Sequence, residues 1–317
     1  MRGRECGDAV PRDFALCLAP LLTLALMATS AGTASAQELE PRAYSASPIG
    51  TTFLVVGVGR STGSVLVDPS LPFEDVKARL GVGTVGVGHS FDLASRSALF
   101  LVAAPYARAR ATGRVEEATT EVQRRGWADM RMKLSVNLLG GRALRPREFA
   151  AARRGPIVGA SLSVGAPTGT YHSDRLVNLG SNRWSYKPEM GVSVPVGRWT
   201  LEGYAGVWLF TANDSFFPGT ATREQTPVSA FQWHVSYTAR PRLWLAFDAT
   251  WYSGGTSKVN GIDKADLQRN SRIGGAISVP LGRRQSIKGA FSTGATTRIG
   301  GDFNTFGVTW QMTWLRP

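Results

Sequence analysis

The chain has 317 residues, and its 36 Lys and Arg residues outnumber its 23 Asp and Glu residues, which gives a formal net charge of +13. Its two cysteines, Cys6 and Cys17, fall within the first element described below, so thiolate metal sites and cysteine nucleophiles are excluded from the remainder. The positive charge alone would suit a nucleic-acid-binding protein, but the chain has neither a basic helix nor a zinc pattern, so we expect no nucleic-acid partner.

The first element along the chain has the pattern of a secretory signal peptide. Residues 1–12 carry three arginines, an apolar run fills residues 14–27, and small residues end at Ala34-Ser35-Ala36. A basic start, a short apolar run and an A-x-A site are typical of a cleaved export signal. We therefore expect residues 1–36 to be removed near Ala36 and the rest to reach the outer membrane of a Gram-negative bacterium.

Residues 37–50 form a short segment with two prolines between the signal peptide and the first expected strand. Two interpretations of this segment stay open: it is a loose lead in the periplasm, or it folds into the protein as a latch. Arg42 and Tyr44 are the candidate contacts of such a latch, and Arg42 would pair with Glu189 or Glu202.

An alternation with period two dominates residues 51–317. In residues 129–138, DMRMKLSVNL, the apolar side chains fall on one face and the polar or charged ones on the other. Such alternation is typical of a strand, and a tilted strand crosses the hydrocarbon in about 9–11 residues. The sequence thus predicts an all-β fold, a single transmembrane antiparallel β-barrel of about 12 strands. The predicted strands cover residues 51–60, 79–91, 98–110, 127–139, 156–167, 184–196, 199–211, 227–239, 242–253, 271–281, 285–297 and 303–315.

The connections between these strands alternate in length, as in outer-membrane barrels with short periplasmic turns and longer external loops. With the N-terminus in the periplasm, we expect external loops at residues 61–78, 111–126, 168–183, 212–226 and 254–270. The periplasmic connection 140–155 is predicted to hold a short helix that begins at Pro146. Arginines gather in the predicted periplasmic turns, where they would face lipid headgroups or attract anions.

Charged residues within the strands are predicted to face the lumen, because a Lys or Arg on the lipid face at the membrane midplane costs about 2–4 kcal/mol. Aromatic residues near the external mouth would suit an aromatic permeant, and Lys187 and Glu189 are expected at that mouth. The candidates for lining the path are Arg131, Lys133, Lys187, Glu189, Glu202, Tyr204, Trp208, Phe210, His234, Asp248 and Tyr252.

Enzymatic motifs are missing from the sequence. His172-Ser173-Asp174 are neighbours on a predicted loop, whereas the members of a triad converge in space from separate positions. Neither G-x-S-x-G nor H-E-x-x-H occurs. We expect no catalytic residue, no metal site and no cofactor.

Several segments resemble the MetA-pathway phenol-degradation family. Leu39-Glu40-Pro41-Arg42-Ala43-Tyr44-Ser45 is similar to the start of its mature chains, and similar segments follow at residues 48–50, 182–189, 213–217, 223–225 and 267–272. The resemblance implies an outer-membrane transporter associated with the breakdown of aromatic compounds, and it implies no catalytic residues. The C-terminal Trp314-Leu315-Arg316-Pro317 departs from the terminal aromatic residue that barrel-assembly machinery usually recognises.

The polar lumen and the resemblance together indicate an outer-membrane channel for passive uptake of small molecules, with aromatic or phenolic compounds as candidates. A structural or adhesive barrel with a plugged lumen is the alternative, followed by a membrane-barrel lipase. The expected partners are outer-membrane lipid, a small-molecule permeant and, during biogenesis, the barrel-assembly machinery.

Overall fold

A computed structural model describes residues 39–66, 73–115 and 118–315. The expected signal peptide and its cleavage site therefore lie outside the described residues, and so do the first two residues of the segment 37–50.

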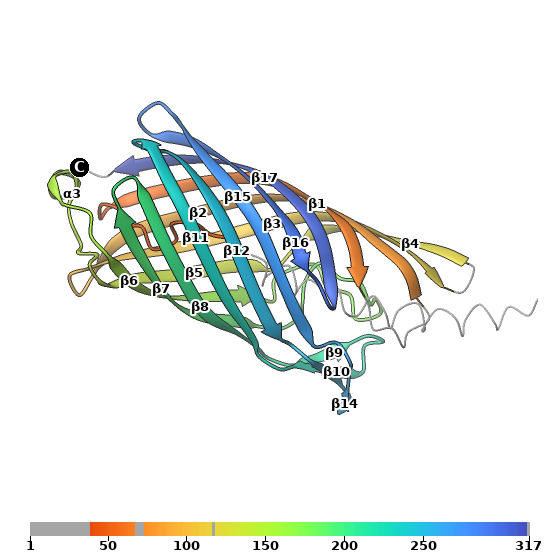
Figure 1. Ribbon diagram of the computed structural model, residues 1–317. Coiled ribbons are helices and arrows are strands. Elements are labelled where there is room, and N and C mark those ends of the chain that lie inside the picture. The colour runs from red at the N-terminus through yellow and green to blue at the C-terminus, as the bar shows by residue number, and fades with distance from the viewer. Residues whose placement is uncertain (1–38, 67–72, 116–117, 316–317) are drawn as a thin grey trace, which may run out of the picture.

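Within the described residues, twelve antiparallel strands form one sheet that closes into a barrel (Figure 1). This confirms the predicted fold class and strand number, and each predicted strand has its counterpart. Closure occurs between the first and last strands, which pair in register from Thr51 opposite Leu315 to Leu66 opposite Gly300. The strands that span the barrel in one piece are β1 (Thr51–Leu66), β2 (Phe73–Leu93), β3 (Arg96–Val115), β6 (Ile157–Ala166), β7 (Ser185–Val196), β8 (Trp199–Phe210), β11 (Val228–Arg240), β12 (Leu243–Gly254), β15 (Gln268–Leu281), β16 (Gln285–Thr296) and β17 (Gly300–Leu315).

The fourth barrel strand consists of two pieces, β4 (Ala118–Trp127) and β5 (Met130–Leu139), which both pair with β3. The break falls at Asp129, whose carboxylate accepts hydrogen bonds from the backbone N–H groups of Gly169 at 2.9 Å and Ser181 at 2.8 Å. Asp129 thus ties the connection between β6 and β7 to the barrel wall.

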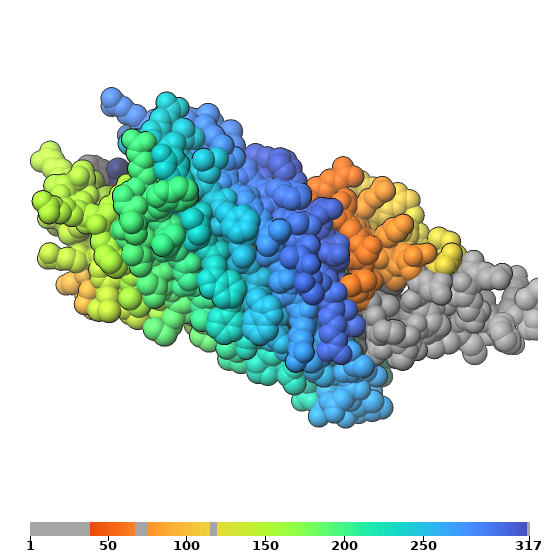
Figure 2. All heavy atoms as spheres, in the orientation of Figure 1, coloured from red at the N-terminus to blue at the C-terminus, as the bar shows by residue number. Residues whose placement is uncertain are grey.

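The barrel wall is apolar outside and polar inside, as the period-two pattern predicts. Large apolar side chains stay exposed on the outer face, for example Val58 at 65 %, Phe247 at 57 % and Trp233 at 51 %. Figure 2 shows this wall over β8, β11, β12 and β15. A continuous apolar exterior of this kind is a lipid-facing surface. No helix in the described part of the chain is long and apolar enough to cross a membrane.

The two ends of the barrel differ. One end, here called the turn end, carries the tight turns after β2, β7, β11 and β15 and the helix α3 (Pro146–Ala151). The helix confirms the prediction, and the carboxylate of Glu148 caps it by accepting a hydrogen bond from the Arg145 N–H at 3.0 Å. At this end Arg242 donates to the carbonyl oxygens of Gly282 and Arg283, both at 2.7 Å, so it braces a neighbouring turn.

The opposite end, here called the loop end, corrects the predicted loops. Much of residues 61–78 and 111–126 is strand, because the alternation continues there with polar outward residues beyond the length that spans hydrocarbon. Residues 212–226 and 254–270 contain a small sheet that was not predicted. Its strands are β9 (Asn213–Phe216), β10 (Ala221–Gln225), β13 (Ser257–Val259) and β14 (Ile262–Asp263).

We predict that Val87→Lys destabilises the folded barrel by about 2–4 kcal/mol, because Val87 is 51 % exposed on the apolar outer face of β2, in the half of the strand nearer the turn end. Thr62→Lys is the matched control, since Thr62 lies on the same outer face beyond the aromatic residues of the loop end. Urea titrations of the protein folded into vesicles would measure both changes. An equal effect of the two substitutions would contradict the assignment of Val87 to the hydrocarbon.

Candidate permeation site in the barrel lumen

Residues 39–50, here called the N-terminal segment, run inside the barrel. At the turn end the Gly50 N–H donates to the Ser90 carbonyl at 2.8 Å, and the Pro48 carbonyl accepts from the hydroxyls of Thr51 and Ser90, both at 2.6 Å. Deeper in the lumen the segment makes side-chain contacts with β5, β6, β7, β8, β11 and β12. The segment therefore lies across the lumen instead of hanging below it.

Arg42 forms the first anchor of the segment. Its backbone N–H donates to Glu202 Oε2 at 2.7 Å, and its guanidinium donates to the hydroxyls of Ser236 at 3.0 Å and Thr238 at 2.7 Å. The guanidinium also lies 4.8 Å from the centre of the Trp244 ring. Arg42 thus meets Glu202, one of the two acids proposed from the sequence, but through its main chain, while its charged group binds β11.

Tyr44 forms the second anchor and is only 1 % exposed. Its ring packs over Gly159 and Gly191, which are paired across β6 and β7; a Cβ atom at either glycine would lie 2.2 Å from the ring. The ring also meets Tyr204 edge-on, with centroids 5.0 Å apart. The Tyr44 side chain therefore occupies a niche that exists only because both wall residues are glycine.

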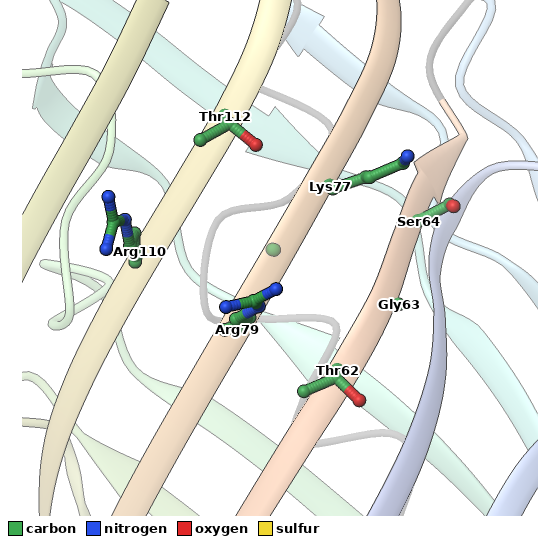
Figure 3. A pocket seen from close by; sticks show the side chains of 8 residues that line it. Thr62, Gly63, Ser64, Lys77, Arg79, Arg110 and Thr112 are labelled. Carbon is green, nitrogen blue, oxygen red and sulfur yellow. The ribbon is translucent and has the colours of Figure 1, made fainter.

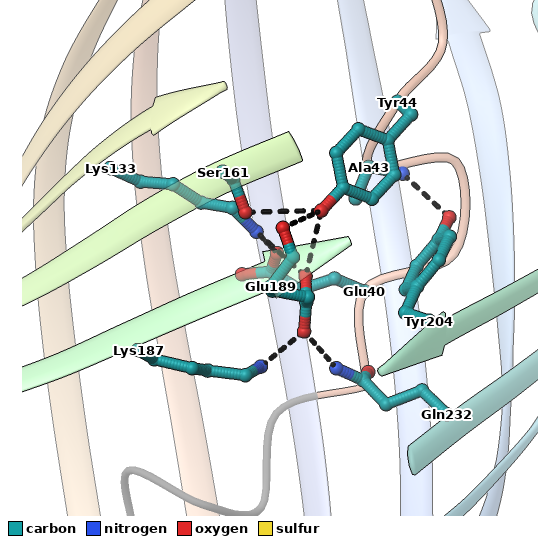
Figure 4. A network of polar contacts seen from close by, with 9 residues as sticks. All are labelled: Glu40, Ala43, Tyr44, Lys133, Ser161, Lys187, Glu189, Tyr204 and Gln232. Carbon is teal, nitrogen blue, oxygen red and sulfur yellow. Dashed lines mark hydrogen bonds and ion pairs between the residues drawn. The ribbon is translucent and has the colours of Figure 1, made fainter. Parts of the chain in front are cut away.

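Glu189 joins Tyr44 to a network of charges (Figure 4). Its carboxylate accepts hydrogen bonds from Lys187 Nζ at 2.6 Å, Gln232 Nε2 at 3.1 Å and the Tyr44 hydroxyl at 3.2 Å. Lys133 Nζ lies 4.0 Å from the same carboxylate and 2.5 Å from Glu40 Oε2 in the N-terminal segment. Two lysines of the wall are thus neutralised by one wall carboxylate and one segment carboxylate.

A second polar group lies around His234 on β11. His234 Nδ1 is 2.6 Å from Asp248 Oδ1 on β12, and its ring lies 4.9 Å from the Tyr204 ring. Among the described residues, no hydrogen-bond partner exists for the buried atoms His234 Nε2 and Glu202 Oε1. Buried polar atoms generally have partners, so this part of the lumen is suited to polar solutes or water.

The aromatic candidates gather in a separate cluster. Trp208, Val228 and Tyr252 are buried together, and Phe210 stacks on Trp208 with centroids 6.5 Å apart. The Lys187 ammonium lies 5.6 Å from the centre of the Trp208 ring, so this cluster adjoins the charged network. The lumen therefore combines an ionic zone with an aromatic zone.

The structure brings together most of the residues expected in the lumen. Lys187 and Glu189 lie toward the loop end of β7, but each is only 4 % exposed, and Glu189 contacts Tyr44 of the N-terminal segment. Arg131 is half-buried, on the same face of β5 as Lys133. The sequence reasoning missed Glu40, Ser161, Gln232, Ser236 and Thr238; alternation would have placed Gln232 and Ser236 beside His234.

The surroundings of the N-terminal segment also shift the pKa values of its titratable side chains. The ammonium of Lys133 lowers the pKa of Glu40 from 4.5 to about 2, against the opposing effect of burial. Burial, and next the charge of Glu189, raise the pKa of Tyr44. Burial lowers the pKa of Arg42, and the charge of Glu202 offsets part of this. At neutral pH the segment therefore carries a negative Glu40 and a neutral Tyr44.

Across residues 39–66, 73–115 and 118–315, no three His, Cys, Asp or Glu side chains gather closely enough to bind a metal ion.

The closed sheet, apolar exterior and polar lumen define a transmembrane β-barrel of the outer-membrane type. The chain belongs to the family described as "Putative MetA-pathway of phenol degradation", whose sequence profile matches residues 58–315. A search of curated proteins found no match.

An outer membrane channel and an autotransporter β domain are among the solved structures that are similar to the barrel. The COG4313 outer membrane channel from Pseudomonas putida F1 superposes with a TM-score of 0.72 at 20% identity, covering 87% of this chain and 100% of the channel. The β domain of the Bordetella autotransporter BrkA gives a TM-score of 0.52 at 10% identity, covering 84% of this chain and 100% of that domain. At these identities the likeness concerns the fold.

We predict that Gly191→Val expels the Tyr44 ring from its niche and raises the single-channel conductance in planar bilayers. The added side chain would overlap the rings of Tyr44 and Tyr204. Gly203→Val is the matched control, because a Cβ at Gly203 meets nothing within 4 Å. If a folded Gly191→Val protein conducted like the control, Tyr44 would not limit passage.

The lowered pKa of Glu40 predicts that docking of the N-terminal segment weakens at acid pH. Because the docked carboxylate has a lower pKa than its ordinary 4.5, ionisation favours docking. That contribution is complete above about pH 4.5 and is lost as the pH falls toward 2. We therefore expect the conductance of the wild-type protein to rise as the pH is lowered from about 6 to about 3.

The Glu40→Gln variant separates the effect of Glu40 on conductance from the titration of other lumenal acids. The variant should conduct more than the wild type at about pH 6, and the difference should shrink by about pH 3. If the difference in conductance between the two proteins stayed constant across this range, protonation of Glu40 would not be the cause of the pH dependence.

Proposed function

We propose that the protein is an outer-membrane channel for passive passage of small molecules, with aromatic and phenolic compounds as its permeant class. The loop end faces outward and the turn end faces the periplasm. The observation that carries the proposal is that the N-terminal segment occupies the lumen and is anchored there by charged and polar side chains. In the part of the chain that the structure describes, the lumen is not filled by a core of apolar side chains.

The N-terminal segment is suited to act as a removable constriction. Its covalent link to the barrel is at Gly50, just before β1, while its inner contacts are hydrogen bonds, one ion pair and the ring contacts of Tyr44 and Arg42. A hydrogen bond contributes about 0.5–1.5 kcal/mol net, because water replaces the lost partner. The segment can thus leave the lumen without disturbing the closed sheet.

The permeant class follows from the aromatic cluster beside the charges. Trp208, Phe210 and Tyr252 form a packed aromatic cluster, and Lys187 adjoins it with a positive charge. A small aromatic ring that bears a hydroxyl or carboxylate matches this combination. Family membership in phenol degradation and the likeness to an outer membrane channel support the same class. Channel-type relatives also favour a role without catalysis.

A sealed structural barrel is the second candidate, and the position of Tyr44 favours it. The Tyr44 side chain is 1 % exposed in its wall niche, so the docked segment is packed firmly inside the barrel. In a channel the docked segment would exchange with a released state that opens the lumen, whereas in a sealed barrel it would stay docked.

We predict that the protein, refolded in liposomes, passes benzoate faster than arabinose in swelling assays. Deleting residues 39–47 should raise the flux of both solutes by removing the constriction. Trp208→Leu should reduce the preference for benzoate, whereas Trp251→Leu should preserve it, because Trp251 is exposed on the lipid face.

Heat-dependent gel mobility would verify that each variant is folded. Flux of neither solute through the folded wild-type protein would overturn the channel and favour the sealed barrel. Equal flux of the two solutes would retain a channel but overturn the aromatic preference.

A further inference from the structure

The outer face of the barrel carries a basic patch at the loop end of β1 to β4. Strand pairing places Arg60, Arg108 and Arg125 in one row across these strands, and Arg79 and Arg110 in the next row, with Lys77 in the row beyond. All six side chains are exposed. They point away from the lumen, because they alternate with inward residues such as Val76 and Ala107.

The patch begins directly beyond an aromatic level. Tyr106 and Trp127 are paired partners on β3 and β4, one step nearer the turn end than Arg108 and Arg125, and their rings meet edge-on at 5.4 Å. Phe306, which is 58 % exposed, is the neighbour of Arg60 on β17. Exposed aromatic rings mark the membrane interface of such barrels, so the arginine rows stand at the depth of lipid headgroups.

The acidic groups on this face leave a clear positive excess. Glu121 lies 2.5 Å from Arg110, and Asp75 lies 3.5 Å from Arg114, a neighbour of the patch. Among the side chains that the structure describes on this face, these two carboxylates and exposed Asp302, which is paired with Ser64, face seven basic side chains. At the loop end of β11 and β12 the lipid face instead presents Phe231 and Trp251. The excess described here lies on β1 to β4, whereas β15 presents Arg269 as its outward basic side chain at this end.

The patch also has a shaped surface. Lys77, Arg79 and Arg110 surround a hollow of about 490 Å³ together with the hydroxyls of Thr62, Ser64 and Thr112 (Figure 3). Guanidinium groups bind phosphate oxygens through paired N–H donors, and hydroxyls add further hydrogen bonds. The volume falls in the range of small-ligand sites.

We propose that this face binds the phosphorylated headgroup of an outer-leaflet lipid of the lipid A type. The acyl chains would lie against the apolar wall below the Tyr106 level, and the phosphates would contact Arg79, Arg110 and Lys77. The proposal rests on the membrane orientation given above and is independent of permeation through the lumen.

The test is a titration of the folded, detergent-solubilised full-length protein with fluorescent bis-phosphorylated lipid A. Lys77→Gln/Arg79→Gln/Arg110→Gln should weaken binding about tenfold or more and reduce its dependence on salt. Arg147→Gln/Arg153→Gln/Arg154→Gln removes the same charge from exposed positions at the turn end and should change affinity less than about twofold. Heat-dependent gel mobility would confirm folding of both variants.

Competition experiments separate the sources of phosphate. Inorganic phosphate and phosphatidylglycerol, at equal phosphate concentration, should displace lipid A poorly. Effective displacement by inorganic phosphate would show that the patch binds free anions and would overturn the lipid assignment. Effective displacement by phosphatidylglycerol would overturn the outer-leaflet assignment. Equal affinity of the two triple variants, or no binding of lipid A, would overturn the proposal, and the liposome flux assay would be unaffected by either result.

Discussion

The pairing of β1 with β17 is the constraint on which the rest of the structure depends. In hydrocarbon no water is present to satisfy backbone N–H and C=O groups, and each unsatisfied group costs several kcal/mol. The sheet must therefore close, and the register from Thr51 to Leu66 closes it along the full length of β1. Twelve strands enclose a wider space than an eight-stranded barrel, whose side chains fill the interior. The N-terminal segment occupies the space that closure creates.

Charge balance in that space explains why the segment is polar. Removing one partner of a buried ion pair costs about 3–5 kcal/mol, because the other charge stays desolvated. Glu189 is shared by Lys187 and Lys133, and Glu40 of the segment brings a further negative charge to Lys133. The main-chain N–H groups of Arg42 and Ala43 add partners for Glu202 and the Tyr204 hydroxyl. The segment thus supplies hydrogen-bond and ion-pair partners to several buried polar groups of the wall.

The sequence was sufficient to predict the strands and the face of each residue, because alternation is imposed directly by lipid on one side and a polar lumen on the other. It was insufficient to predict which lumenal residues meet. Glu189 contacts Gln232 across β8, and this depends on the stagger between strands, which alternation does not encode. Gly159 and Gly191 are separated by more than thirty residues and become a niche only when β6 pairs with β7. The extent of the strands was underestimated because they continue beyond the membrane.

The distribution of the segment's contacts along the chain has a consequence for biogenesis. Tyr44 meets partners 117 and 145 residues away, and Arg42 meets partners 160 to 196 residues away. Contacts between such distant residues form late, because the intervening chain must first be organised. A half-assembled sheet lacks the docking positions on β7, β8 and β11, so the N-terminal segment can dock only in a barrel that is already nearly complete. Docking of the segment therefore distinguishes a finished barrel from an incomplete one, in which the N-terminal segment has no complete set of partners.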